Sequence, residues 1–212
     1  MLQNLFSRHS RITGAVIGCL GIAVLSGAPA RAALILPGIA TGACDNATLS
    51  QPFSAWGDTN EYKLVPGGTF QGGASGWTLS NGATVVAGGA PYGVTASAGS
   101  SSVDLAAGAS VTSPFTCVNA SYPTFRFFAR NNGVLSNLTV SVVYNQPIVG
   151  QVVLPVGTVA LNGTWKPSAP MATQSALEGL LSGGTAQVAL RFTSLSGNSQ
   201  IDGVYVDPMM HD

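Results

Sequence analysis

Apolar and polar residues alternate with a period of two through much of the second half of this chain. The clearest segments are 124–130, 138–145 and 187–193. Neighbouring side chains on a β-strand point to opposite faces, so each segment would place one apolar face against a core. The pattern predicts antiparallel strands rather than helices.

Shorter apolar stretches bounded by Gly, Pro and Asn predict further strands. Asn81-Gly82 predicts a hairpin turn between two of them, and only 174–181 has the pattern of a short helix. About ten short strands without crossover helices favour an all-β, two-sheet antiparallel β-sandwich over a parallel α/β sheet. The further strands are expected at 69–71, 77–79, 83–87, 101–105, 110–113, 115–118, 151–161 (interrupted at Pro155) and 200–206.

Residues 1–32 have the pattern of a secretory signal peptide. A basic stretch at 8–11 precedes an apolar run at 12–25, and Ala30-Arg31-Ala32 offers a cleavage site. The run is shorter than the roughly 20 residues that cross a bilayer. We therefore expect a secreted, extracellular mature protein, residues 33–212, that forms a single domain and has no membrane segment after leader removal.

Cys19 leaves one alternative open. Residues 16–19 read VIGC and resemble a lipobox, which would anchor the protein to lipid through Cys19. The apolar run continues past Cys19, which favours release.

The mature chain keeps two cysteines, Cys44 and Cys117. In an oxidising compartment such a pair is expected to form a disulfide. The bond would close 117 − 44 = 73 residues.

The composition argues against several function classes. After residue 32 there are five basic and eight acidic residues, so the mature net charge is 5 − 8 = −3, without a basic patch for nucleic acid. The single histidine after residue 32, His211, lies next to the C-terminus, which argues against a Ser-His-Asp triad and against zinc. Asp58 with Glu61 is the remaining catalytic candidate, as the carboxylate pair of a glycoside hydrolase. We expect no enzyme and read these carboxylates as surface charge.

Two segments of the chain read as recognisable strand motifs: residues 66–77 read PGGTFQGGASGW, and residues 200–207 read QIDGVYVD. The first resembles the opening strand, and the second the last strand, of galactose-binding-like jelly rolls, a group that includes carbohydrate-binding modules. The mature chain is also similar to a set of secreted bacterial proteins of unassigned function. The resemblance implies a jelly roll whose first and last strands are neighbours, and a non-catalytic binding function.

Many jelly rolls of this group hold a structural calcium between the two end strands. Here Gln71 and Gly203 stand where the group has carboxylates, and Asp202 remains. Calcium prefers several oxygen ligands including carboxylates. The resemblance therefore implies at most a weak calcium site at Asp202 and Gln71; the alternative is that both side chains bridge strand ends.

Exposed aromatics beside polar side chains are typical of sugar-binding sites. Trp56 with Asp58, Tyr92, and Trp165 lie in segments expected to be loops, and are the candidates for ligand binding. The alternative is that they cover the edge of the core. Trp77 is expected inside the core.

A second candidate surface is the polar face of the long strands, where Arg126, Arg130 and Arg191 are expected to gather and to bind an anionic or hydroxylated ligand. The alternative pairs these arginines with Asp104 and Asp202. Together these observations predict a secreted binding module for carbohydrate or a cell-envelope polymer. A structural or adhesive surface protein is the first alternative, and a glycoside hydrolase the second.

Overall fold

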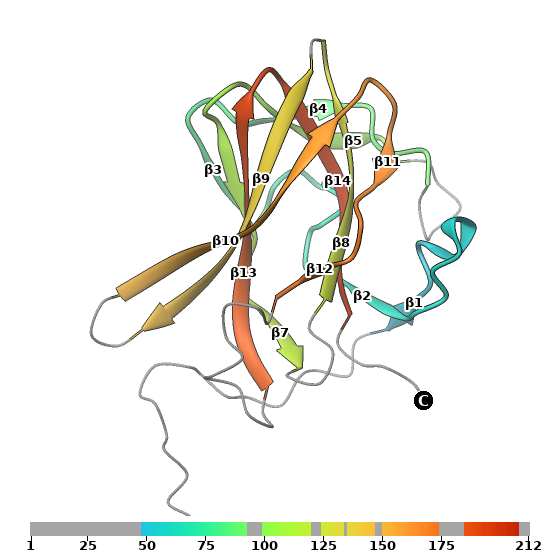
Figure 1. The fold of residues 1–212 in the computed structure, drawn as a ribbon, viewed down its shortest axis with the longest axis vertical. Helices are drawn as coiled ribbons and strands as arrows, with labels where there is room; N and C mark the ends of the chain where they lie inside the picture. The colour runs from blue at the N-terminus through green and yellow to red at the C-terminus, as the bar shows by residue number, and fades with distance from the viewer. Residues whose placement is uncertain are drawn as a thin grey trace, which may run out of the picture. The chain divides into compact units, whose positions relative to one another are not determined.

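The computed structural model describes residues 48–92, 99–119, 124–133, 135–146, 150–173 and 185–207. They form two antiparallel β-sheets and a single 3-10 turn, η1 (Ser54–Trp56), which confirms the predicted all-β two-sheet sandwich (Figure 1). Among these residues, no helix has the length and apolar character needed to cross a membrane. The expected leader, Cys44, the short helix at 174–181 and His211 lie outside the described residues.

The last strand, β14 (Ser199–Asp207), is the centre of the first sheet. β8 (Thr124–Asn131) pairs along one side of β14. The other side is shared by β5 (Ser101–Leu105) and β2 (Tyr62–Leu64). Four short strands complete this sheet: β1 (Leu49–Ser50) beside β2, β4 (Thr84–Ala87) beside β5, and β11 (Lys166–Pro167) and β12 (Met171–Ala172) beside β8.

The second sheet is built around β13 (Thr185–Ser196), which pairs with β9 (Ser136–Gln146) on one side and β6 (Ser110–Thr112) on the other. Beyond Val143, β9 pairs with β10 alone, and the two strands continue as a long hairpin that diverges from β13 (Figure 1). The remaining strands are β10 (Gly150–Leu161) beside β9, β3 (Thr78–Ser80) beside β6, and β7 (Thr116–Asn119) beside the first residues of β13.

One large apolar core joins the two sheets. The rings of Phe127 on β8 and Phe192 on β13 meet edge to face with centroids 4.9 Å apart. The alternating faces predicted from the sequence lie in this core, since Leu138, Val140 and Leu190 are fully buried there. Each such buried side chain contributes about 1.5–3 kcal/mol to folding.

The interruption expected at Pro155 is confirmed. The register of β10 against β9 shifts between Pro155 and Gly157. Proline lacks the N–H that a ladder needs, so it is tolerated at a bulge on an edge strand.

The hairpin predicted at Asn81-Gly82 is wrong, although the turn itself is present. Asn81 and Gly82 have φ of 55° and 86°, and the Ala83 N–H donates to the Ser80 carbonyl at 3.2 Å. However, β3 pairs with β6 in the second sheet, whereas β4 pairs with β5 in the first. The turn therefore carries the chain from one sheet to the other, because turn residues set the local bend but burial of each strand's apolar face selects its partner.

The strand predicted at 69–71 is also wrong, because this segment forms consecutive turns. Phe70 has φ of 55° and is fully buried against Trp77, with ring centroids 4.8 Å apart. The Trp77 indole donates to the Pro66 carbonyl at 2.9 Å. Trp77 thus lies in the core, as expected.

The opening segment nevertheless lies beside the last strand, as the resemblance implied. The Val65 N–H donates to the Val204 carbonyl at 3.0 Å, and the Val204 N–H donates to the Gly68 carbonyl at 3.1 Å. A side chain at Gly68 would approach the Val204 carbonyl to 2.8 Å, so the two backbones meet too closely for anything larger than glycine.

A second, smaller apolar cluster covers the outer face of the first sheet. The 51–61 loop packs over this face and inserts the fully buried Phe53. Phe128, which the alternation of β8 placed among polar side chains, is fully buried beneath the loop, so β8 carries apolar residues on both faces. We call this group the outer cluster: Phe53, Tyr62, Ala90, Phe128, Trp165 and Tyr205.

Candidate functional site

Two exposed aromatic side chains meet on top of the outer cluster. Trp56 ends η1, and Tyr92 follows the segment that leaves β4. Their rings pack edge to face with centroids 4.7 Å apart and planes at 88°. Each side chain remains 40% exposed. We call Trp56 and Tyr92 the aromatic pair.

Phe128 supports the aromatic pair from below. Its ring centroid lies 5.5 Å from Trp56 and 5.7 Å from Tyr92. Phe53 in turn packs 5.2 Å from Phe128. Residues from two loops and one strand are thus locked into a single aromatic stack, which leaves one surface of the pair open.

An ion pair holds the loop that carries Trp56 onto the sheet. Arg126 Nη1 on β8 donates to Asp58 Oδ2 at 2.6 Å, and the Tyr62 hydroxyl donates to the same oxygen at 2.7 Å. The Asn60 N–H donates to the other carboxylate oxygen at 3.1 Å. Arg126 also donates through Nε to the Ser168 carbonyl, and its guanidinium lies 4.3 Å from the Phe53 ring centre.

These contacts shift the pKa values of Asp58 and Tyr62. Burial alone would raise the pKa of Asp58, but the hydrogen bonds from Tyr62, Arg126 and Asn60 outweigh it, so the pKa lies below its usual value. Burial and then the bond to Asp58 raise the pKa of Tyr62. Asp58 is therefore a permanent acceptor at neutral pH, and both of its oxygens already accept protein hydrogen bonds.

Trp165 also joins the outer cluster but is buried, with 8% exposure. The Arg130 guanidinium lies over its ring, 5.0 Å from the centre. Arg130 Nε donates to Gln200 Oε1 at 2.7 Å. Arg130 therefore occupies the Trp165 ring face, and Trp165 offers no open aromatic surface to a ligand.

The predicted arginine face is wrong as a single surface. Arg126 and Arg130 lie on β8 in the first sheet, whereas Arg191 lies on β13 in the second. Arg191 donates to Thr112 Oγ1 at 2.9 Å and to Gln151 Oε1 at 3.3 Å. The sequence could not reveal this separation, because alternation identifies a polar face without identifying the sheet that carries it.

Asp202 and Gln71 both hold the segment between β4 and β5. Asp202 Oδ2 accepts from the Ala90 N–H and Oδ1 from its own Gly203 N–H, both at 2.7 Å. Gln71 Oε1 accepts from the N–H and hydroxyl of Ser100. Burial raises the pKa of Asp202 to about 7.

This arrangement does not fit a calcium site. The oxygens of both side chains accept protein N–H or O–H groups, and within the described part of the chain no three His, Cys, Asp or Glu side chains cluster as metal ligands would. The observed bonds correspond to the alternative expectation, in which both side chains bridge strand ends.

Cys117 lies buried on β7. Its expected partner Cys44 is outside the described residues. The disulfide therefore stays a prediction.

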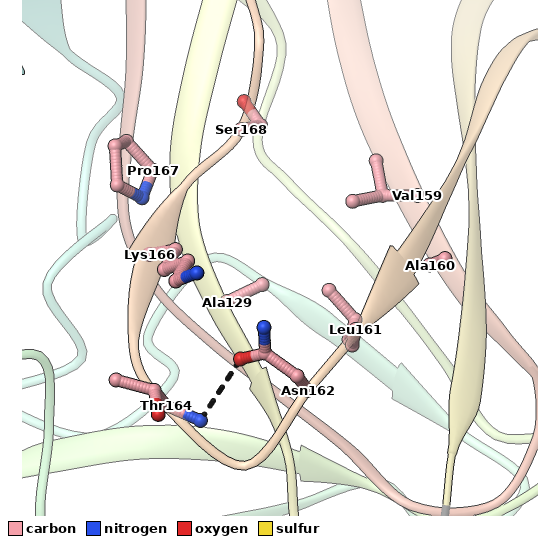
Figure 2. A pocket seen from close by; sticks show the side chains of 9 residues that line it. All are labelled: Ala129, Val159, Ala160, Leu161, Asn162, Thr164, Lys166, Pro167 and Ser168. Atoms are coloured by element: carbon pink, nitrogen blue, oxygen red, sulfur yellow. Dashed lines mark hydrogen bonds between the residues drawn. The ribbon is translucent and has the colours of Figure 1, made fainter.

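A small pocket of about 130 Å³ opens between the end of β10 and β11 (Figure 2). Figure 2 shows Lys166 on one wall and Asn162 on the connecting loop, where the Thr164 N–H donates to Asn162 Oδ1 at 3.1 Å. None of the predicted ligand residues lines this pocket. It is also smaller than the roughly 300–1,000 Å³ of typical ligand pockets. The aromatic pair is therefore the stronger candidate site.

Trp56, Tyr92, Asp58 and Arg126 were named from the sequence as candidates, but their contacts with one another were not predicted. The support from Phe128 and the stacking of Arg130 on Trp165 were missed as well. The signal for Phe128 was available, since a large aromatic residue between two arginines on a polar strand face indicates that something covers that face.

Comparison with family models and with curated proteins gives no match. Among solved structures, the CBM22-1 and GH10 modules of Clostridium thermocellum endo-1,4-beta-D-xylanase 10B, complexed with xylohexaose, are 14% identical with a TM-score of 0.45, over 72% of this chain and 29% of that chain. The CBM22-1 xylan-binding domain of Paenibacillus barcinonensis Xyn10C is 13% identical with a TM-score of 0.44, over 68% of this chain and 93% of that one. The family 11 carbohydrate-binding module of Clostridium thermocellum, in complex with a beta-1,3-1,4-mixed-linked tetrasaccharide, is 12% identical with a TM-score of 0.40. The match covers 66% of this chain and 93% of that chain.

Proposed function

We propose that this protein is a secreted, non-catalytic carbohydrate-binding module in which the aromatic pair, Trp56 and Tyr92, stacks against sugar rings. The observation that carries the proposal is that two large aromatic side chains, each 40% exposed, are held in contact at 4.7 Å. Sugar rings present apolar C–H faces that pack on such surfaces. Each 50 Å² of apolar surface that a stacked ring removes from water contributes about 1 kcal/mol.

The rigidity of the pair supports this role. Phe128 fixes both rings from below, and the Asp58–Arg126 bond fixes the loop that carries Trp56. A surface that is already ordered loses little conformational entropy on binding. The pair is thus suited to binding a sugar ring without first having to be ordered.

The same contacts weigh against the glycoside hydrolase alternative. A hydrolase needs a carboxylic acid with a raised pKa to protonate the leaving group. The pKa of Asp58 is lowered, and its two oxygens are taken up by Arg126, Tyr62 and Asn60. Asp58 is suited to positioning the loop.

The proposal includes export. Cleavage after Ala32 would release a single domain, residues 33–212, and an oxidising compartment would join Cys44 to Cys117. A glycan in the envelope or the surroundings of the cell is the ligand that such a protein meets.

A glycan array probed with the mature protein tests the proposal. We expect wild type to bind at least one glycan class, and Trp56→Ala and Tyr92→Ala each to weaken that binding about tenfold or more. Phe115→Ala is the matched control, because Phe115 is an equally exposed aromatic (39%) that directly precedes β7 of the second sheet, whereas the pair lies over the first sheet. The proposal fails if no glycan is bound, or if Phe115→Ala weakens binding as much as Trp56→Ala.

The structural or adhesive alternative predicts a different result. Wild type would then assemble with rising concentration in the absence of any glycan, as light scattering would show. We expect the molar mass of the mature protein, as obtained from light scattering, to be independent of concentration.

A further inference from the structure

Arg130 holds its guanidinium in a fixed position over Trp165. Its Cζ lies over the Trp165 ring, 5.0 Å from the ring centre, and its Nε donates to Gln200 Oε1 at 2.7 Å. Across the described residues, neither Nη group of Arg130 has an acceptor. Stacking and the Nε bond orient the guanidinium, so its two terminal nitrogens form a preset fork of donors.

The fork lies on the same face of the first sheet as the aromatic pair. Arg130 and Phe128 are two residues apart on β8, so they share a face and are separated by about 7 Å. Phe128 contacts both Trp56 and Tyr92. A ligand that stacks on the pair and extends along β8 therefore runs towards the Arg130 guanidinium.

The other charges of this face do not neutralise Arg130. Arg126 and Asp58 neutralise each other across 2.6 Å. Asp202 is buried and bonded to backbone N–H groups. Asp104 on β5 and Arg130 on β8 lie on opposite sides of Gln200, because each is paired with that residue of β14. Two strand spacings separate their backbones by about 10 Å. At that distance salt screens most of the attraction between the two charges.

From these placements we propose that the module selects acidic glycans, and that the Arg130 fork binds a carboxylate on a sugar residue next to the one stacked on the aromatic pair. A carboxylate matches the spacing of two guanidinium N–H groups and accepts two parallel, charge-assisted hydrogen bonds. A neutral glycan would leave the fork hydrated and gain only the stacking contact. The inference rests on the proposed function, because it assigns Arg130 to the same glycan site.

The test compares hexasaccharides of galacturonate, guluronate and glucuronate-containing hyaluronan with their fully methyl-esterified forms, which keep the sugar rings and lose the charge. Binding is measured by calorimetry with wild type, Arg130→Gln, Arg130→Lys and Arg191→Gln. Arg191→Gln is the matched control, because Arg191 also bonds neutral side chains but lies on the other sheet.

We expect wild type to prefer at least one acid over its ester by about tenfold or more, and Arg130→Gln to abolish the preference by weakening the binding of the acid much more than that of the ester. Arg130→Lys keeps the charge without the fork and should restore only part of the preference. Arg191→Gln should behave as wild type.

The inference is overturned if wild type binds the ester as well as the acid, and the proposed function survives that result because stacking alone explains it. Tighter binding of a sulfated hexasaccharide than of every uronate also overturns it, since a sulfate would then be the group recognised. If no acid, ester or neutral glycan is bound, both the proposed function and this inference are wrong.

Discussion

Arg126 on β8 donates to Asp58 at 2.6 Å, and this bond ties the 51–61 loop to the first sheet. Both side chains are largely buried, with 8% and 13% exposure. Removal of one partner would leave the other as an uncompensated buried charge, which is costly.

Asp58→Ala is therefore expected to lower the free energy of unfolding by about 3 kcal/mol, as measured by urea denaturation. Asp104→Asn is the control, because Asp104 is partly exposed and its bond from Asn132 is long, 3.5 Å. The double variant Asp58→Ala, Arg126→Met should be more stable than the sum of the two single losses predicts. Additive losses would show that the two side chains act independently.

Asp202 makes stability depend on pH between about 4 and 7. Burial raises the pKa of Asp202 from 3.8 to about 7, so the folded state binds a proton that the unfolded chain releases in this range. The contribution of Asp202 is fully present below pH 3.8 and is lost as pH rises through 7, by at most roughly 4 kcal/mol.

Urea titrations at a series of pH values check this expectation. The free energy of unfolding of wild type should fall from pH 4.5 to pH 8, and Asp202→Asn should flatten the profile. The lowered pKa of Asp58 acts in the opposite direction, since its contribution is lost only as pH falls below about 4. A wild-type profile that is flat or rises between pH 4.5 and 8 would contradict the assignment.

Gly89 and Gly99 enclose the Asp202 carboxylate, and a Cβ at either position would lie 2.5 Å from Asp202 Oδ2. Gly89→Ala should therefore lower thermal stability through a loss of about 1–3 kcal/mol. Gly72→Ala is the matched control, because a Cβ at Gly72 meets no atom within 4 Å. Equal melting temperatures for Gly89→Ala and Gly72→Ala would contradict the close packing around Asp202.

The predicted disulfide has a simple chemical check. The intact mass of the mature protein should rise by about 2 Da on reduction, and the loss of a 73-residue loop constraint should lower stability by up to about 4 kcal/mol. Cys117→Ser should reproduce the loss of stability. An unchanged mass on reduction would show that Cys44 and Cys117 do not pair.

The sequence predicted most strands but not how they are paired. Alternation placed Leu138, Val140 and Leu190 in the core because burial of a strand face leaves a period-two pattern in the sequence. It could not show that β3 and β4 belong to different sheets, because the Asn81-Gly82 turn serves a hairpin and a sheet crossing equally well.

The candidate site was predicted in part for a similar reason. Loop aromatics are visible in a sequence, so Trp56 and Tyr92 were identified, but their contact depends on two loops brought together by Phe128. Trp165 has the same loop context and is nevertheless buried under Arg130. Exposure depends on tertiary packing, which no local pattern encodes.

Stacking of a sugar on Trp56 can be measured through the three tryptophan indole N–H signals in a ¹H–¹⁵N spectrum while a glycan that binds on the array is added. Trp77 is bonded to the Pro66 carbonyl inside the core and serves as the internal reference, whereas Trp165 lies under Arg130 and reports on that side chain. We expect the Trp56 signal, assigned by its loss in Trp56→Phe, to shift in a saturable way while the Trp77 signal stays in place. A Trp56 signal that does not move while the protein becomes saturated with glycan would contradict sugar binding at the aromatic pair.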